Sequence, residues 1–306
     1  MPGAPRLPNV TIPDGLRWWR TVTGGTDWLD LLPRLVGECA EQWSLEVGAS
    51  FEEAHVSLVT RVRLPDGTAA VLKINFPDAE SEQEPGALEH WNGKGAVRLM
   101  AYDDARRALL VERCQPGTTL WALEDEEEAI AIAAGVLGRL WRPPPAEHVF
   151  RPLSTEAERW VEELPHRWQN LGRPIERELL DEAVSFLRDA GPTQGELVVV
   201  HQDFHGGNVL SATREPWLAI DPKPLVGERE FDTASLLRDR RQELSRDPHP
   251  ARTVRRRLDQ LASELELDRG RMRGWGIAHA LAWGMNESLV LEDMITCARW
   301  LAESRL

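Results

Sequence analysis

The sequence contains no apolar run close to the roughly 20 residues that a membrane-spanning helix needs. Its start, MPGAPRLPNV, has no basic segment followed by an apolar one, so we expect no secretory signal and a cytoplasmic location. Cysteine is scarce, and the three residues Cys39, Cys114 and Cys297 share no metal-ligand spacing. We therefore expect buried thiols rather than disulfides or zinc ligands.

Basic side chains are outnumbered, with 36 Lys and Arg against 50 Asp and Glu and a formal net charge of −14. Such a charge repels nucleic acid and anionic lipid, so we expect neither a nucleic-acid nor a membrane partner. The content of 42% hydrophobic and 28% charged residues is typical of a globular protein. A chain of 306 residues is long enough for one large domain or two lobes.

Strand signals in the first third of the chain predict a small antiparallel sheet. Residues 56–63 alternate between apolar and polar, 64–68 (Leu-Pro-Asp-Gly-Thr) form a turn signal, and 69–74 resume the alternation, which indicates a β-hairpin. Around it we expect an irregular lead-in and a helix (1–25, 26–43), then a helix and two short strands (81–92, 96–100, 108–111).

The remainder of the chain is mainly helical in pattern. Helices are expected over 124–141, 155–171, 176–190 and, with weak breaks at Pro248–Pro250 and near Gly270 and Gly274, over 232–306. Two short apolar strands, 197–200 and 217–220, interrupt this pattern. The sequence thus predicts an α+β protein with a sheet-containing lobe, 1–113, and a helical lobe, 114–306.

Two acidic segments that follow these strands carry the strongest chemical signal. The first strand leads into His-Gln-Asp-Phe-His-Gly-Gly-Asn (201–208), and the second leads into Asp221. Phosphoryl transfer needs a carboxylate that accepts the proton of the attacking hydroxyl, and oxygen ligands for Mg²⁺. We assign Asp203 as the base and Asn208 and Asp221 as metal ligands. A structural turn rich in Gly, Asn and His is the alternative interpretation.

Other residues complete this picture. Lys73, in the strand Ala-Ala-Val-Leu-Lys-Ile, suits a lysine that neutralises nucleotide phosphates. Glu84 is our choice for the carboxylate that orients it, with Glu82 and Glu89 as alternatives. The backbone near Glu112, Arg113 and Cys114 is expected to pair with adenine, on position alone. His201 is expected to support the 201–208 loop, and His205 to approach a substrate.

Some features point less clearly to function. A G-x-G-x-x-G phosphate loop is missing, and only Val47–Ser50 followed by 51–56 fills its place. Four arginines, Arg252, Arg255, Arg256 and Arg257, form a basic cluster that we interpret as a solvated helix face. Residues 124–128 are expected to form a charged first turn that the helix dipole favours.

The segments H-Q-D-F-H-G-G-N-V-L and W-L-A-I-D-P-K-P-L-V-G-E-R-E-F-D resemble the aminoglycoside and hydroxyurea phosphotransferase family, most closely its streptomycin 6-phosphotransferase branch. Further matches, including G-A-V-R-L and L-L-V-E-R, extend the resemblance over about residues 55–285. Gln202, Phe204 and the Gly206–Gly207 pair depart from the commonest residues of the family's loop.

The resemblance implies a protein-kinase-like bilobal fold, ATP or GTP with Mg²⁺, and a small antibiotic as the phosphorylated partner. It implies that Asp203 is the base, that Asn208 and Asp221 bind metal, that Lys73 binds phosphate, and that Asp232 braces the loop. Carboxylates would then attract a cationic substrate. The candidates for this role are Glu228, Glu230, Asp239 and Glu287.

Two other functions remain open at this point. The acceptor could be hydroxyurea, a sugar or another metabolite, because kinases of these compounds share the Asp-Asn-Asp set. The chain could also be a nucleotide-binding module without catalysis, although a pure binder gains nothing from a base. The oligomeric state and the phosphorylated hydroxyl have no signature in the sequence.

Overall fold

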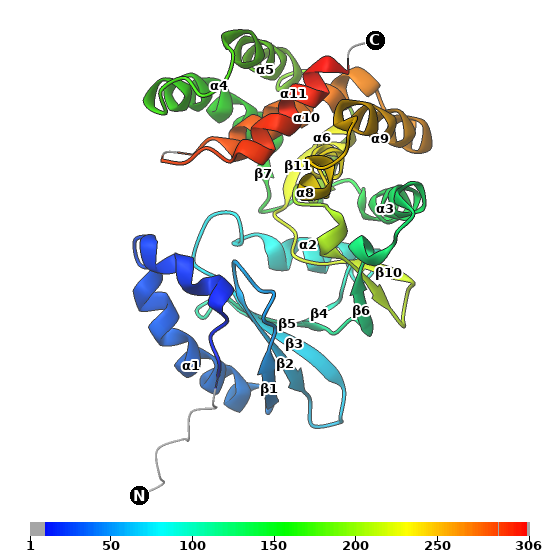
Figure 1. Cartoon of the computed structure of the whole chain (residues 1–306). Helices are drawn as coiled ribbons and strands as arrows, with labels where there is room; N and C mark the ends of the chain where they lie inside the picture. The colour runs from blue at the N-terminus through cyan, green and yellow to red at the C-terminus, as the bar shows by residue number, and fades with distance from the viewer. Residues whose placement is uncertain (1–9, 287, 305–306) are drawn as a thin grey trace, which may run out of the picture. The chain divides into compact units, whose positions relative to one another are not determined.

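The computed structural model describes residues 10–286 and 288–304 (Figure 1). The chain divides into two compact units, Met1–Gln115 and Pro116–Leu306. All three cysteines are buried free thiols, as the sequence predicts. Across the described residues, none of the helices combines the length and the apolar character needed to span a bilayer.

The first unit is built on a five-stranded antiparallel sheet with the strand order β1-β2-β3-β5-β4. Its elements are η1 (Asp14–Thr21), α1 (Gly25–Gln42), β1 (Glu46–Ser50), β2 (Leu58–Arg63), β3 (Ala69–Ile74), α2 (Glu84–Trp91), β4 (Leu99–Asp103) and β5 (Ala108–Glu112). The predicted hairpin is confirmed, because β2 pairs with β3 in the register Leu58 to Ile74.

Helix α1 provides one face of this unit's core. Its apolar residues Leu29, Leu32 and Val36 are buried together with Leu58 and Leu72 of the sheet. The predicted helix is confirmed, but its N-cap is Gly24 in a left-handed conformation, and no side chain caps it.

The segment before α1 was expected to be irregular, which is wrong for η1. Trp19 of this 3₁₀ helix stacks on Phe76 with ring centroids 4.0 Å apart, and Leu16 is fully buried. Burial of large side chains in the core therefore orders a segment whose local pattern gave no signal.

The other errors in this unit concern strand boundaries. The strand expected over 96–100 is β4, which starts three residues later, and 46–50 forms the additional strand β1. Strand β1 pairs with β2, and its register shifts between Val47 and Ser50. Such irregular pairing hides the alternation on which sequence-based prediction depends.

The second unit contains most of the helices. Its elements are β6 (Pro116–Thr119), η2 (Leu120–Ala122), α3 (Glu126–Leu140), β7 (Arg151–Pro152), α4 (Leu153–Asn170), α5 (Arg177–Ala190), β8 (Leu197–Val200), η3 (Gly206–Asn208), β9 (Val209–Ala212), β10 (Trp217–Ala219), β11 (Leu225–Glu228), α6 (Arg229–Asp232), α7 (Ala234–Leu237), α8 (Arg241–Leu244), α9 (Pro250–Leu265), α10 (Arg269–Gly284) and α11 (Glu292–Glu303).

The two strands predicted here are confirmed, but they lie in different sheets. β8 belongs to the three-stranded sheet β7-β11-β8, and β10 belongs to the sheet β10-β9-β6. Four short strands, β6, β7, β9 and β11, were not predicted. Asp221 therefore lies beside the 201–208 loop because β9 and β10 form a hairpin, not because β8 and β10 are neighbours.

The C-terminal break expected at Pro248–Pro250 is confirmed, because α8 ends at Leu244 and α9 begins at Pro250, and the break expected near Gly270 lies slightly earlier in the chain. The break between α9 and α10 lies at residues 266–268, and Glu266 has a positive φ of 54°. Gly274 does not interrupt α10. A Cβ there would lie 2.2 Å from Cε2 of Phe186, so the missing side chain allows the ring of Phe186 to approach.

Candidate active site

The loop at residues 201–208 is fixed by the carboxylate of Asp232. The backbone N–H of His201 donates to Oδ1 of Asp232 at 2.9 Å, and that of Gln202 donates to the same atom at 2.7 Å. Asp232 is fully buried, and burial raises its pKa to about 6. It is the last residue of α6, whereas the sequence suggested that it begins a helix.

Two ring side chains of this loop point inward. His201 and Phe204 are both fully buried, with their rings edge to face at 5.4 Å. Nε2 of His201 lies 2.9 Å from the carbonyl oxygen of Ile220, and burial lowers its pKa to about 3. The imidazole is therefore neutral at physiological pH and links the loop to the end of β10.

Asp203 and His205, on either side of Phe204, are partly exposed. Nε2 of His205 lies 3.8 Å from Oδ1 of Asp203. Nδ1 of His205 accepts a hydrogen bond from the N–H of Gly207 at 3.1 Å. Because Nδ1 accepts, the neutral ring carries its proton on Nε2, the nitrogen nearer to the carboxylate.

Asn208 ends this loop, and Asp221 follows Ile220, which is hydrogen-bonded to it. Nδ2 of Asn208 donates to the carbonyl oxygen of Asp203 at 3.0 Å, and the N–H of Ile220 donates to the carbonyl oxygen of Asn208 at 2.9 Å. Asp221 has a positive φ of 57°, and Gln202 has one of 67°. Such left-handed backbone is uncommon outside glycine, and tertiary contacts hold it here.

Lys223 brings the two carboxylates together. Its Nζ lies 4.0 Å from Oδ2 of Asp203 and 3.7 Å from Oδ1 of Asp221, and the residue is 9% exposed. Its backbone N–H donates to the carbonyl oxygen of His201 at 3.0 Å. Sequence reasoning missed this residue.

The donor set at Asn208 and Asp221 suits Mg²⁺. The hydrogen bond from Nδ2 of Asn208 leaves the amide oxygen as the atom that can bind a cation, and the Asp221 side chain is 31% exposed. Within residues 10–286 and 288–304, no cluster of three or more His, Cys, Asp or Glu side chains could hold a metal ion. Two oxygen ligands with substrate phosphates are a common arrangement for Mg²⁺.

In the first unit, Lys73 and Glu84 form a buried ion pair. Nζ of Lys73 donates to both carboxylate oxygens of Glu84 at 2.7 Å, and the residues are 7% and 2% exposed. Asn75 also donates to Oε2 of Glu84 at 2.7 Å. Glu82, one of the alternatives, lies in a longer ion pair with Arg107.

The segment Glu112–Cys114 follows β5 in the first unit. The carboxylate of Glu112 accepts a hydrogen bond from the backbone N–H of Arg98 at 3.1 Å. Cys114 is buried and Arg113 is half-buried. These side chains belong to the fold of the first unit, so only the backbone of the segment remains a candidate for contact with a base.

The predicted substrate carboxylates do not form one acidic surface. Glu228 is 1% exposed, and it binds Arg271 through contacts of 2.9 and 3.0 Å and also the indole N–H of Trp275. We therefore withdraw Glu228 as a substrate ligand, because an internal ion pair already neutralises it. Glu230 is half-buried, and Glu287 lies outside the described residues.

Asp239 also has a different partner from the one expected. Its Oδ1 accepts a hydrogen bond from Nε1 of Trp121 at 2.7 Å, and its Oδ2 accepts one from the N–H of Gly206 at 2.8 Å. Both oxygens are thus occupied within the fold, and we withdraw Asp239 as a direct substrate ligand.

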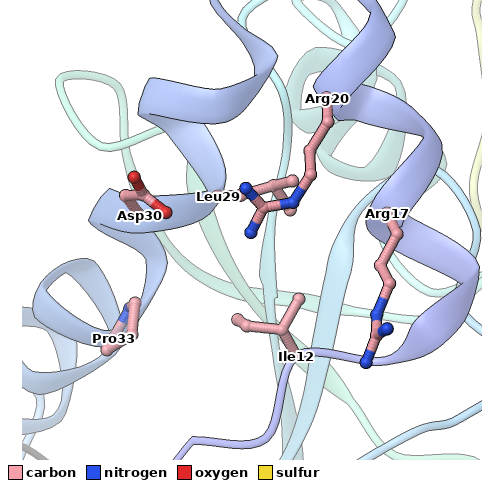
Figure 2. Close-up of a pocket in the computed structure, with 6 residues that line it drawn as sticks. All are labelled: Ile12, Arg17, Arg20, Leu29, Asp30 and Pro33. Carbon is pink, nitrogen blue, oxygen red and sulfur yellow. The ribbon is translucent and has the colours of Figure 1, made fainter.

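A surface pocket lies in the first unit between η1 and α1. Its lining consists of Ile12, Arg17, Arg20, Leu29, Asp30 and Pro33 (Figure 2). None of these residues belongs to the set that the chemistry requires, so we do not assign the active site there.

The fold places the protein in a known class. An aminoglycoside phosphotransferase crystallised with ADP and hygromycin B is similar to it with a TM-score of 0.59 and 16% identity, covering 87% of this chain and 95% of that one. A choline kinase from Streptococcus pneumoniae has a TM-score of 0.57 and 13% identity, covering 89% and 99%. The protein has the protein-kinase-like fold, and the relatives at 36–37% identity described next show that it is a phosphotransferase whose acceptor is an alcohol group.

The sequence comparison is more specific. Residues 42–288 match the model of the aminoglycoside/hydroxyurea antibiotic resistance kinase family, and the chain belongs to this family. A streptomycin 6-kinase of Streptomyces griseus is 37% identical over 303 residues, covering 96% of this chain and 98% of that protein. A hydroxyurea phosphotransferase of Kitasatospora aureofaciens is 36% identical over 259 residues, covering 84% and 73%.

Proposed function

We propose that the protein is an ATP-dependent O-phosphotransferase that acts on a hydroxyl group of a streptomycin-like aminoglycoside. One observation carries the proposal: Asp203 and Asp221 both lie within 4.0 Å of a single ammonium group, that of Lys223. Asn208 is hydrogen-bonded to the backbone of Asp203 in the same cluster. The relatives named as streptomycin 6-kinases support the choice of acceptor.

In the proposed reaction, Asp203 orients the acceptor hydroxyl and takes its proton. The hydroxyl oxygen forms a bond to the γ-phosphorus of ATP while the bond from that phosphorus to the β,γ-bridging oxygen breaks, which releases ADP. The ammonium group of Lys223 lies beside the carboxylates of Asp203 and Asp221. A phosphoryl group that is transferred at these carboxylates is therefore close to this positive charge, which stabilises the negative charge on its oxygens.

The nucleotide and metal are assigned to the remaining predicted residues. Asn208 and Asp221 would hold Mg²⁺, which when bound neutralises charge on the phosphate oxygens. Lys73, oriented by Glu84, would bind the α- and β-phosphates. The backbone of Glu112–Cys114 would pair with adenine. We assign residues 1–113 to the nucleotide-binding lobe and 114–306 to the catalytic lobe, close to the two compact units.

The direct test is to incubate the protein with MgATP and streptomycin and to measure ADP release and the mass of the product. We expect a product heavier by one phosphoryl group. Asp203→Asn should lower kcat by about 1,000-fold, because a positioned general base contributes on that order. No ADP release above background with the wild-type protein would exclude streptomycin as the acceptor.

Hydroxyurea is the second candidate acceptor, because a relative at 36% identity is named for it. A panel with streptomycin, other aminoglycosides and hydroxyurea separates the two, since only the true acceptor gains phosphate. A nucleotide-binding module without catalysis would bind MgATP and phosphorylate none of them. In that case the wild type and Asp203→Asn would bind MgATP equally well, and neither would form a phosphorylated product.

A further inference from the structure

An exposed aromatic surface adjoins Asp203. Trp121 of η2 is 45% exposed, and its ring is nearly parallel to that of His205, with centroids 5.2 Å apart and planes inclined by 10°. His205 is in turn 3.8 Å from Asp203, Nε2 to Oδ1. The two rings are stacked, and the stack begins beside the proposed base and ends at a tryptophan that is 45% exposed.

The orientation of Trp121 is fixed by Asp239. Asp239 accepts hydrogen bonds from the indole N–H and from the N–H of Gly206, so it ties the ring to the 201–208 loop. An exposed tryptophan that is held in one orientation loses little conformational entropy when a ligand stacks on it. Such preorganisation is a feature of binding surfaces rather than of incidental surface residues.

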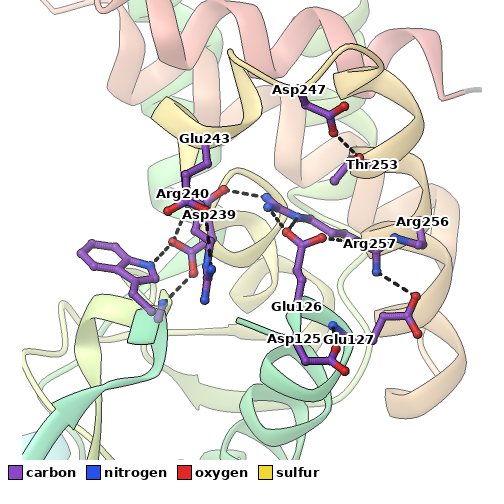
Figure 3. A network of polar contacts seen from close by, with 12 residues as sticks. Asp125, Glu126, Glu127, Asp239, Arg240, Glu243, Asp247, Thr253, Arg256 and Arg257 are labelled. Carbon is purple, nitrogen blue, oxygen red and sulfur yellow. Dashed lines mark hydrogen bonds and ion pairs between the residues drawn. The ribbon is translucent and has the colours of Figure 1, made fainter. Parts of the chain in front are cut away.

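Further contacts hold the segment that follows Trp121. Arg257 is 3% exposed and binds both the carboxylate of Glu126 and, at 2.6 Å, the carbonyl oxygen of Asp239 (Figure 3). Arg240 donates to the carbonyl oxygen of Leu123 at 2.7 Å. The basic cluster on α9 was predicted to be a solvated face, which is wrong for Arg257, because it binds the acidic first turn of α3.

The Gly206–Gly207 pair leaves the room that the indole ring occupies. A Cβ at Gly206 would lie 2.6 Å from Cδ1 of Trp121, and one at Gly207 would lie 2.6 Å from its Cη2. Real Cβ atoms do not approach other atoms so closely, and the ring is rigid. The two glycines thus leave the space that the indole ring of Trp121 occupies.

We propose that the stack of Trp121 on His205 forms a platform beside Asp203, and that a cationic group of the acceptor, a guanidinium or ammonium on a sugar-like ring, stacks on the indole of Trp121. This inference rests on the proposed function. A planar cation is attracted to the face of an indole ring. The carboxylates of Asp203 and Asp239 flank the two rings and favour a cation over an anion at this surface.

The test compares Trp121→Phe with Trp121→Leu. Both variants keep a large apolar side chain, but only Trp121→Phe keeps an aromatic ring. With streptomycin and ATP, we expect Trp121→Leu to raise the KM for streptomycin by roughly 10-fold and Trp121→Phe to raise it by less than about 3-fold. The KM for ATP should not change. Calorimetric titration with streptomycin should show the same loss of affinity.

Trp18→Leu is the matched control. Trp18 is also 45% exposed, but it lies in η1 of the first unit. Equal KM values for streptomycin in Trp121→Leu and the wild type would overturn the platform, as would a change confined to the KM for ATP or an equal loss in Trp121→Phe and Trp121→Leu. A wild-type protein that does not phosphorylate streptomycin would instead refute the proposed function.

Discussion

Lys223 and Asp221, two residues apart in the chain, hold their charged groups 3.7 Å apart, Nζ to Oδ1. The left-handed backbone at Asp221 and the hydrogen bond from the N–H of Lys223 to His201 hold this short segment against the 201–208 loop. The chain contains only three lysines, Lys73, Lys94 and Lys223. Two of the three, Lys73 and Lys223, are buried beside carboxylates. An ammonium group is a compact point charge, whereas a guanidinium is a larger planar fork, so arginine is not an equivalent replacement at such positions.

Replacement of Lys223 should therefore affect the chemical step. Lys223→Met removes the cation from beside Asp203 and Asp221, and we expect kcat to fall about 100-fold, as when one donor to a transition-state charge is lost. The KM for the acceptor should change little. Steady-state kinetics, together with titration of MgADP, would check both expectations.

Lys94→Met is the control, because Lys94 is exposed in the turn after α2. It should retain the wild-type kcat. If Lys223→Met also retained it, Lys223 would have no role in phosphoryl transfer.

The buried pair Lys73–Glu84 gives a prediction for stability. Glu84→Gln leaves the ammonium of Lys73 buried without its carboxylate, and we expect the free energy of unfolding to fall by about 3 kcal/mol. The affinity for MgATP should also fall, because the lysine loses its orientation. Urea denaturation and nucleotide titration measure the two effects.

Glu82→Gln provides the comparison on the same segment. The Glu82 side chain is 59% exposed and lies 3.9 Å from Arg107, so its loss should change stability by less than about 0.5 kcal/mol. The double variant Lys73→Met/Glu84→Leu should recover most of the stability but not the nucleotide affinity. Recovery of both would contradict the assignment of Lys73 to phosphate binding.

The close contact between Gly207 and Trp121 predicts a steric coupling. Gly207→Ala places a Cβ 2.6 Å from the ring, and we expect a loss of about 1–3 kcal/mol in the free energy of unfolding. Trp121→Ala removes the obstacle, so the double variant should show a coupling energy above about 1 kcal/mol in a double-mutant cycle. Additive effects of the two changes would argue against the contact.

Gly138→Ala serves as the control for glycine replacement. Gly138 lies in α3, and a Cβ there would meet no atom within 4 Å. Alanine is the better helix former, so this change should stabilise the protein by roughly 0.5–1 kcal/mol.

His279 predicts how stability depends on pH. It is fully buried among the rings of Trp160, Phe231 and Trp283, and burial lowers its pKa well below 6.5. Below about pH 6.5 the unfolded chain takes up a proton that the folded protein excludes, so this histidine reduces stability by up to about 1.4 kcal/mol per pH unit as pH falls.

His279→Phe should remove that part of the slope between about pH 6.5 and 5 and should cost little at pH 7.5. His201, with a pKa of about 3 in the folded state, supplies a similar slope that remains. The control is His249→Phe at an exposed position before α9. Thermal melts across this pH range would count against the prediction if His279→Phe and the wild type showed the same slope.

Several elements were correctly predicted because their signal is local. The alternation in 69–74 and the turn Asp66-Gly67 define a hairpin whose partners are close in sequence. The apolar strand 197–200 ends at the residues that carry the strongest chemical pattern. By contrast, β11 and β4 lack such a pattern because their pairing partners, rather than their own periodicity, determine them.

The site residues divide in the same way. The spacing of Asp203, Asn208 and Asp221 was visible in the chain, while Lys223 and Trp121 gave no pattern of their own. The scarcity of lysine was the one signal that could have drawn attention to Lys223. Glu228 and Asp239 were chosen for their charge, and only the structure reveals that other side chains already occupy their oxygens.

The sequence by itself determined the kind of protein and proposed its reactive groups, because side-chain identity, spacing and local periodicity are properties of the chain. Tertiary structure decided which charges are neutralised internally and which backbone is held in unusual conformations. It also decided which ring stacks on His205, beside Asp203. These depend on contacts between residues far apart in sequence, such as Trp121 and Asp239, and no local pattern encodes such contacts.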